Sequence, residues 1–381
     1  MEDNMNKTIV HTTSVLIGIL TLLAACTSLP PQETIKIGWI GGLTGSGASY
    51  GNVELNAAKM ALDDLNAAGG INGKHVELLV EDGKCDGSAA TTAATKLIEV
   101  DQVKYIIGGH CSTESLSIVP ITERNKIFML AGATATAKFA GSGKYAFRTT
   151  SSVVGLSDKL ANIAVKNQNM SVATLHELKD WPQSSTDTFV KSFTERGGKI
   201  LGQETFAPGT TDFKTQLLKI NDLHPDALVI SVQAPDTAAL ILKQMNELGL
   251  LNKIQIYGDL LFITKAAYDS SGGLLPETAI GTTHVVDQTN PATKAFLDRY
   301  HQKFGAIGVT EFFATEGYDG VRITADLIAA CATDVDCARQ TLLAKQWQGV
   351  TGTFTFNEQG DATPHTGVVR IVHGNAVYTT E

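Results

Sequence analysis

The chain has 381 residues, of which 43% are hydrophobic and 18% are charged, and its formal net charge at pH 7 is −9. This composition is ordinary for a soluble globular protein, and the length is enough for two domains of about 100–200 residues each. An acidic chain without a cluster of basic residues argues against binding to nucleic acid, or to anionic lipid through a charged surface.

The beginning of the chain has the pattern of a secretion signal. Val15 to Ala25 form an uncharged apolar run, which is shorter than the roughly 20 residues that a membrane-spanning helix needs. The run ends in Leu-Ala-Ala-Cys, which resembles the bacterial lipobox, in which the cysteine is acylated after the signal is removed. We therefore predict a lipoprotein signal peptide over 1–25, lipidation of Cys26 and a tether over 26–34.

Two alternatives stay open for this segment. Glu2 and Asp3 stand where a basic leader is usual, so Met5 is an alternative start. The apolar run is also compatible with a buried core segment that ends in a cysteine, because short motifs carry a risk of false matches. No later apolar run is long enough to span a membrane, so we expect membrane contact through the lipid anchor only.

The other cysteines indicate an oxidising compartment. They are four in number: Cys85, Cys111, Cys331 and Cys337. An even number in an exported chain fits two disulfides, and the spacing alone leaves three pairings open. His110 stands beside Cys111 but lacks the spacing that brings ligands together on zinc, so we expect no metal site.

Strand and helix signals alternate along the mature chain. Strands are expected at Ile35–Ile40, Val76–Val80, Val103–Ile107, Ile127–Ala131, Ser171–Leu175, Lys199–Phe206, Ala227–Val232, Ile254–Gly258, Gly352–Phe356 and Gly367–Val372. Helices are expected around Leu55–Leu65 and at Ala89–Val100, Ser112–Arg124, Ser184–Glu195, Asp212–Asn221, Ala238–Leu248, Pro291–Phe304, Thr310–Ala330 and Val335–Lys345. Such alternation predicts open parallel α/β sheets. Ligands of these folds bind beyond the carboxyl ends of the strands.

Several segments together resemble the leucine/isoleucine/valine-binding protein family, the type I periplasmic binding proteins of branched-chain amino-acid ABC importers. They are IKIGWIGGLTGSGASYG, NAAGGINGKHVELLVEDGKCDGSAA, KYIIGGHCSTES, and GATA followed by FRTT. The resemblance implies an α/β fold of two Rossmann-like lobes with parallel sheets, joined by a three-strand hinge. The first lobe would span 35–150 plus 283–361, and the second 151–282 plus 362–381. It also implies that Cys85 pairs with Cys111, which leaves Cys331 for Cys337.

The same resemblance implies a site for the carboxylate of an amino acid. Ser112 begins an expected helix, whose first N–H groups and dipole favour an anion, and the family's serine at this place binds the ligand carboxylate. A plain helix cap is the alternative for this serine. Gly132, Ala133 and Thr134 follow a buried strand, where the family holds the carboxylate and the ammonium. Aligning from Cys111 shifts this match by one residue, so that Ala133 or Ala135 takes the place of Thr134.

The remaining expected ligand contacts are aromatic or acidic. Tyr50, Trp181 and Phe313 match aromatic positions that flank the ligand in the family, with core packing as the alternative for Phe313. Asp259 is the candidate partner for the ligand's ammonium. It stands one position earlier than the family's glutamate, and Ala234 replaces a tyrosine of the leucine-binding proteins, so leucine itself is not assumed.

We therefore expect a monomeric, lipid-anchored protein of the periplasm or the cell surface that binds a small amino-acid-like solute for an ABC importer permease, without a cofactor. A sensor of the same fold that signals to a partner protein is the alternative. Gly47 to Gly51 match the G-x-S-x-G motif of hydrolases. That motif requires its serine directly at a strand end, and several loop residues separate Ser49 from Ile40, so we expect no enzyme.

Overall fold

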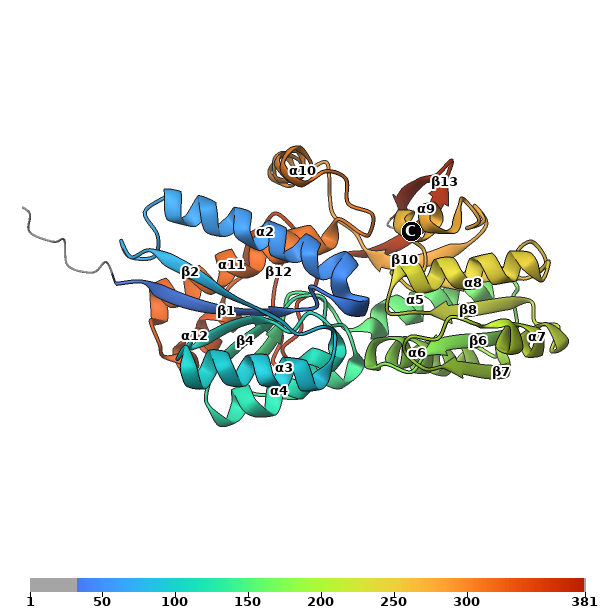
Figure 1. Ribbon diagram of the computed structural model, residues 1–381, viewed down its shortest axis with the longest axis horizontal. Coiled ribbons are helices and arrows are strands. Elements are labelled where there is room, and N and C mark those ends of the chain that lie inside the picture. The colour runs from blue at the N-terminus through green and yellow to red at the C-terminus, as the bar shows by residue number, and fades with distance from the viewer. Residues whose placement is uncertain (1–32, 380–381) are drawn as a thin grey trace, which may run out of the picture. The chain divides into compact units, whose positions relative to one another are not determined.

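The computed structural model describes residues 33–379. The predicted signal peptide over 1–25, Cys26 and most of the predicted tether lie outside the described residues. From Ile35 onward the chain builds two α/β lobes, each around one sheet (Figure 1). Among residues 33–379, no helix is both long enough and apolar enough to cross a membrane.

The sheet of the first lobe has five parallel strands in the order β2-β1-β3-β4-β5. The strands are β1 (Ile35–Gly41), β2 (Val76–Asp82), β3 (Tyr105–Gly108), β4 (Phe128–Ala131) and β5 (Ala146–Arg148). Successive side chains of a strand point to opposite faces. Ile37 and Trp39 of β1 therefore lie in one buried cluster and Ile40 in another, so both faces of the sheet need a cover.

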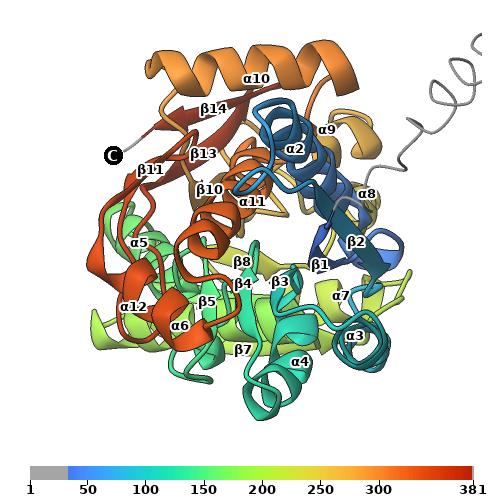
Figure 2. The same cartoon turned by 90° about the vertical axis from the view of Figure 1, so that its left-hand side faces the viewer.

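Helices supply that cover on both sides, as Figures 1 and 2 show. The face of Ile37 is covered by α2 (Ala48–Ala67), α11 (Phe312–Cys331) and α12 (Val335–Ala344), and α10 (Pro291–Phe304) packs on the outer side of α2 and α11 (Figure 2). The face of Ile40 is covered by α3 (Gly87–Thr95), its extension η2 (Lys96–Val100), and α4 (Ser112–Arg124). Short elements complete the lobe: η1 (Gly45–Gly47), η3 (Ala137–Phe139), β11 (Trp347–Gly349) and β12 (Gly352–Phe354).

The sheet of the second lobe has seven strands in the order β14-β13-β10-β9-β8-β6-β7. The strands are β6 (Ser171–Glu177), β7 (Lys199–Phe206), β8 (Ala227–Ser231), β9 (Gln255–Gly258), β10 (Ile280–His284), β13 (Thr366–Val372) and β14 (Asn375–Thr379). The first five of these pair in parallel. The chain's last two strands form a hairpin that joins β10 in the antiparallel sense, so this sheet is mixed at one edge.

This second sheet is also covered on both faces. Helices α5 (Val153–Lys166) and α6 (Asp180–Glu195) pack on one face, and α7 (Lys214–Asp222), α8 (Pro235–Glu247) and α9 (Lys265–Ser271) on the other. The side chains of the strands alternate between these faces: Val229 of β8 is buried with residues of α5 and α6, and Ile230 with residues of α7, α8 and α9. Each aliphatic side chain buried in this way contributes roughly 1.5–3 kcal/mol relative to an exposed one.

Three connections pass between the lobes, because the strands on either side of them belong to different sheets. The first lies between β5 and α5, the second between β10 and α10, and the third between β12 and β13. This arrangement confirms the expected fold of two α/β lobes with a three-strand hinge. The strand β10 lies in the second sheet as far as His284. The exact boundaries of the lobes in the sequence analysis stay predictions.

Both disulfides are present in the structure. Cys85 is bonded to Cys111, and Cys331 to Cys337. The first bond joins the loop after β2 to the residue just before α4, which is the pairing that the resemblance implied. The second closes a short loop between α11 and α12.

Arg148 ties the hinge to the first lobe. It is fully buried at the end of β5. Its Nη1 donates to the carbonyl oxygens of Thr134, at 3.0 Å, and Thr136, at 2.8 Å, and its Nε donates to Asp361 Oδ1 at 2.7 Å. Asp361 lies in the third connection, while Thr134 and Thr136 belong to the loop after β4. One guanidinium therefore fixes the loop after β4 against the hinge.

Replacing this arginine is expected to destabilise the fold strongly. In Arg148→Met, Asp361 and two carbonyl groups lose their donor inside the protein, and breaking such a buried pair costs about 3–5 kcal/mol. The matched control is Arg299→Met, because Arg299 makes a surface ion pair with Asp64 that is worth about 1 kcal/mol or less. Urea unfolding measures both. Equal losses in the two variants would contradict the role assigned to Arg148.

Candidate functional site

The carboxyl ends of the strands from both lobes meet around one small cavity. Its walls come from Tyr50, His110, Cys111, Ser112, Ala133 and Phe313 of the first lobe and Trp181, Gln233, Leu260 and Leu261 of the second. The cavity measures about 10 Å³, which is room for about one water molecule. The two lobes are therefore in contact around this cavity, and its walls leave almost no free space between them.

Ser112 occupies the first position of α4 and lines the cavity. Its Oγ accepts a hydrogen bond from Thr136 N–H at 3.2 Å, so its proton points elsewhere. The first N–H groups of a helix have no partner within the helix, and the 13 residues of α4 add a dipole whose positive end lies here. The hydroxyl and this helix end together provide donors for an anion.

Glu114 fixes the loop that leads to this serine. Its Oε2 accepts from His110 N–H and Cys111 N–H at 3.0 Å each, and its Oε1 accepts from Cys85 N–H at 2.8 Å. Burial raises the pKa of this carboxyl group, against the effect of the three hydrogen bonds. The loop is thus held in shape on the side away from the cavity.

The loop after β4 reaches the cavity through an alanine and turns its polar side chain away. Ala133 lines the cavity. The Thr134 hydroxyl is fully buried, donates to Gly109 O at 2.9 Å and lies 2.5 Å from Ser115 Oγ. A side chain at Gly132 would come within 2.5 Å of His110 Nδ1, so the glycine is needed for packing against that imidazole.

Two aromatic side chains of the first lobe form one wall of the cavity, and a hydrogen bond links them to the second lobe. Tyr50 stacks on Phe313, with ring centroids 5.1 Å apart. Its hydroxyl lies 2.8 Å from Cys111 Sγ and accepts a hydrogen bond from Gln233 Nε2 at 2.6 Å, and Gln233 belongs to the second lobe. Burial raises the pKa of the Tyr50 hydroxyl, which keeps it neutral. This bond joins the two lobes at the wall of the cavity.

Asp259 lies beside the cavity, with its carboxylate engaged by four donors. Its Oδ1 accepts from the N–H groups of Leu261, at 2.9 Å, and Phe262, at 2.8 Å. Its Oδ2 accepts from Val232 N–H at 2.9 Å and from Trp181 Nε1 at 3.2 Å. Burial raises the pKa of Asp259 to about 7, although these hydrogen bonds act in the opposite direction. The residues that reach the cavity from this loop are the next two, Leu260 and Leu261.

Polar contacts at the rim also join the lobes. Lys179 Nζ donates to Cys85 O at 2.8 Å and to Ser46 Oγ at 3.2 Å. Thr113 Oγ1 donates to Asp180 Oδ2 at 3.0 Å. These bonds come from the loops and helix starts that follow β1, β2, β3 and β6, so the rim is built on the same edges of the sheets as the cavity.

Of the predicted ligand contacts, the structure brings Tyr50, Ser112, Ala133, Trp181 and Phe313 to the cavity wall. Gly132, Thr134 and Asp259 lie next to it, with the packing and hydrogen bonds described above. Sequence reasoning missed His110, Gln233, Leu260 and Leu261 as wall residues. Each of them lies within two residues of a strand end or a candidate that had been named, and this proximity was the available signal.

His110 carries no charge in this wall. It is buried against Trp39, with ring centroids 4.7 Å apart, and its Nδ1 contacts Glu54 Oε2. Burial lowers the pKa of this imidazole to about 3, so it is neutral near pH 7. Among the described residues, no group of three or more histidine, cysteine, aspartate or glutamate side chains is arranged to hold a metal ion.

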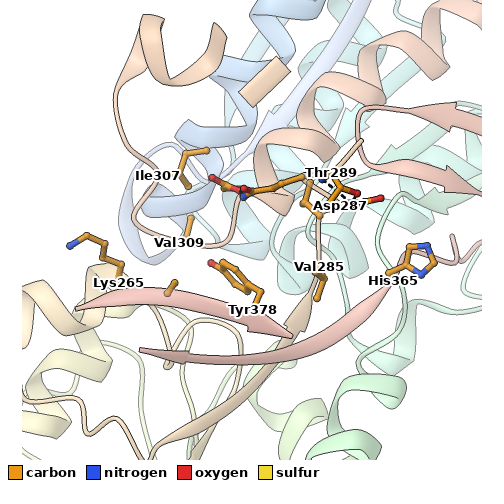
Figure 3. Close-up of a pocket in the computed structure, with 12 residues that line it drawn as sticks. Lys265, Val285, Asp287, Thr289, Ile307, Val309, His365 and Tyr378 are labelled. Carbon is orange, nitrogen blue, oxygen red and sulfur yellow. Dashed lines mark hydrogen bonds between the residues drawn. The ribbon is translucent and has the colours of Figure 1, made fainter. Parts of the chain in front are cut away.

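A second, larger cavity of about 650 Å³ lies at the hinge (Figure 3). Its walls include Val285, Asp287 and Thr289 from the second connection, and His365 from the third. The charged groups on this wall are engaged locally: Glu311 accepts from Gln288 and His301, and Lys265 pairs with Asp269. We call this cavity the hinge groove.

Two α/β lobes that close on a cavity lined by a helix N-terminus and aromatic side chains define a bilobed solute-binding protein. Residues 34–375 match the family model described as periplasmic binding protein, and the chain belongs to this family. It is a solute-binding protein that acts outside the cytoplasm.

Several known proteins are similar to the chain. The leucine-, isoleucine-, valine-, threonine- and alanine-binding protein of Pseudomonas aeruginosa is 26% identical over 86% of this chain and 87% of its own. The crystal structure of a leucine-binding protein from Thermotoga maritima has a TM-score of 0.83 at 25% identity, covering 91% of this chain and 97% of its own. An ABC-transporter solute-binding protein from Rhodopseudomonas palustris, in complex with 3,4-dihydroxybenzoic acid, has a TM-score of 0.80 at 24% identity over 91% and 95% of the two chains, and so shares the fold.

The buried carboxyl group of Asp259 is expected to make stability depend on pH. Its pKa is about 7 in the folded protein and about 3.9 in an unfolded chain. The folded state holds the proton more tightly, so the stabilising contribution is complete at low pH. It falls as the pH rises from about 4 to about 7, by up to about 1.4 kcal/mol per pH unit.

Urea unfolding of Asp259→Asn checks this dependence, because asparagine does not titrate. The variant loses acceptors and is expected to be less stable than the wild type, by an amount that shrinks as the pH rises through this interval. Asp226→Asn is the control, since hydrogen bonds to Ser171 lower the pKa of Asp226. The loss of unfolding free energy in Asp226→Asn, relative to the wild type, should stay nearly constant above about pH 5. Parallel curves for the two variants would refute the expected titration.

Proposed function

We propose that this protein captures an amino acid or a similar small carboxylate in the cleft between its lobes and delivers it to the permease of an ABC importer. The observation that carries the proposal is the cavity wall. It combines the Ser112 hydroxyl and the N-terminus of α4, which suit an anion, with aromatic side chains that suit an apolar body. The names of the relatives, which bind branched-chain amino acids, support the same class of solute.

Closure of the lobes is the step that retains the solute. A ligand shifts a protein between two conformations only by its differential affinity for them. In the closed form the Gln233–Tyr50 hydrogen bond and the Lys179–Cys85 contact join the lobes. A solute that touches both walls at once adds to these contacts and favours the closed form, which is the form that a permease has to recognise.

The protein acts by binding alone and carries out no reaction on its solute in this proposal. It works as a monomer, anchored to a bacterial membrane through a lipid on Cys26, in the periplasm or at the cell surface. The apolar run before Cys26 supports the anchor, and the two disulfides suit an oxidising compartment.

Thermal-shift measurements on the mature protein test the proposal. The panel contains branched-chain, aromatic and polar amino acids, their amides, and small carboxylic acids. A ligand present at 100 times its dissociation constant stabilises the folded state by about 2.7 kcal/mol, which is readily measured. If no compound of the panel raises the melting temperature, the proposed class of solute is wrong.

Ser112→Ala is expected to weaken binding of any carboxylate found in this way by about tenfold to a hundredfold. The reason is that an anion left short of one donor in a closed cleft loses about 1–3 kcal/mol. Ser117→Ala is the control, because the Ser117 hydroxyl lies on the same helix and donates to Thr113 O. Calorimetry measures both affinities. Unchanged affinity in Ser112→Ala would remove Ser112 from the site.

A further inference from the structure

The cavity wall contains no carboxylate. Its ten residues are hydroxyl-bearing, amide, imidazole, sulfur-containing, aromatic or aliphatic, and this holds for every described residue that lines it. An ammonium group has three N–H donors and a full positive charge, so in a closed cleft it needs acceptors and a negative partner. If the protein binds a solute in this cleft, as proposed above, the chemistry of the wall restricts the class of solute. This inference rests on that proposed function.

Asp259 is committed to the protein itself. The four N–H groups that it accepts use about as many lone-pair sites as an ionised carboxylate offers. If the group is instead protonated, it carries no charge for an ammonium to meet. In both protonation states the cavity receives only Leu260 and Leu261 from this loop.

The other buried acidic groups around the cavity are also engaged behind its wall. Glu114 accepts from three backbone N–H groups. Glu177 accepts from Gln233 N–H at 3.0 Å, and burial raises its pKa. Glu54 Oε2 contacts Nδ1 of His110. None of the three lines the cavity, so reaching a ligand would require each to give up its present contact.

An anion, in contrast, finds donors in the same wall. Ser112 and the N-terminus of α4 face the cavity from the first lobe. Most of the rest of the wall is apolar or aromatic, with Trp181, Leu260 and Leu261 from the second lobe and Tyr50 and Phe313 from the first. The amide of Gln233 and the neutral imidazole of His110 are its other polar groups and carry no negative charge. We propose that the solute of this protein is a small apolar monocarboxylic acid, aliphatic or aromatic, that carries no ammonium group.

Matched pairs of compounds test this proposal by calorimetry on the mature protein near neutral pH. The pairs are 4-methylpentanoate with L-leucine and 3-phenylpropanoate with L-phenylalanine, which differ only in the ammonium group. Benzoate and the neutral 4-methylpentanamide complete the set. We expect each acid to bind at least about 100-fold more tightly than its amino acid, a difference of about 2.7 kcal/mol. The neutral amide should bind more weakly than the acid.

The outcomes separate this inference from the proposed function. Tighter binding of the amino acids, or equal binding within a pair, overturns the inference and leaves the proposed function in place. Failure of every acid and amino acid in the set to bind overturns the inference, and the wider thermal-shift panel then decides the proposed function. Binding of 4-methylpentanamide as tight as that of the acid would also overturn the inference, because it would show that the charge is not recognised.

A substitution in the wall provides an independent test. Leu260→Glu places a carboxylate in the cavity and is expected to reverse the preference, with L-leucine gaining and 4-methylpentanoate losing affinity by at least about tenfold each. Leu260→Gln is the matched control, because it is nearly the same size and polar but uncharged, and it should not reverse the preference. Melting temperatures show whether the variants are folded. If a folded Leu260→Glu variant keeps the preference of the wild type, the proposal is contradicted. The comparison of matched pairs on the wild-type protein tests the proposal even if this variant does not fold.

Discussion

Parallel pairing of the strands is the constraint on which the site depends. In a parallel sheet every strand ends at the same edge, so the loops after β1, β3 and β4 are neighbours in space although they are far apart in the chain. The strands β6, β8 and β9 form such an edge in the second lobe. The edge of the first sheet and the edge of the second face each other across the cleft that contains the cavity. The cavity is therefore assembled from short loops whose positions are set by two rigid, fully covered sheets.

The hydrogen bonds among the buried polar groups at these edges determine which polar groups are left to contact a solute. Backbone N–H groups at strand and helix ends need partners when they are buried. Glu114 satisfies three of them in the first lobe, and Asp259 satisfies three in the second, together with the indole of Trp181. These carboxylates hold the loops in shape and do not present their charge to the cavity. The wall that results offers donors to an anion at one end and mostly apolar or aromatic surface elsewhere.

The sequence predicted the order of the elements well, because long amphipathic helices and fully apolar strands have strong patterns. Helices α4 and α10 and strand β7 begin and end where the sequence analysis placed them. The short strand β5, the helices α5 and α9, and the strands β10, β11 and β14 had not been predicted. Several of these lie next to the connections between the lobes. Strands such as β5 and β11 have three residues each, which is too short for a period to be visible.

The sequence predicted which loops form the site, and it predicted less well which side chains of those loops face the cavity. A pattern of strand ends locates the loops, and the family resemblance picked out Tyr50, Ser112 and Trp181, which reach the cavity. The direction of a side chain within a loop depends on which nearby backbone groups need a partner. That is why Thr134 and Asp259 turn away, while Leu260 points inward. The binding roles predicted for Thr134 and Asp259 stay predictions, and the experiments on Ser112 and Leu260 test the wall itself.

The hinge groove has a practical consequence. Its walls belong to the first lobe at Ile307 and Val309, to the second lobe at Lys265 and Tyr378, and to the connecting strands between them (Figure 3). A change in the angle between the lobes must alter the width of this groove. An environment-sensitive dye attached at position 265 would therefore brighten or dim as the cleft fills, which makes the protein a scaffold for a fluorescent sensor whose dye never touches the analyte.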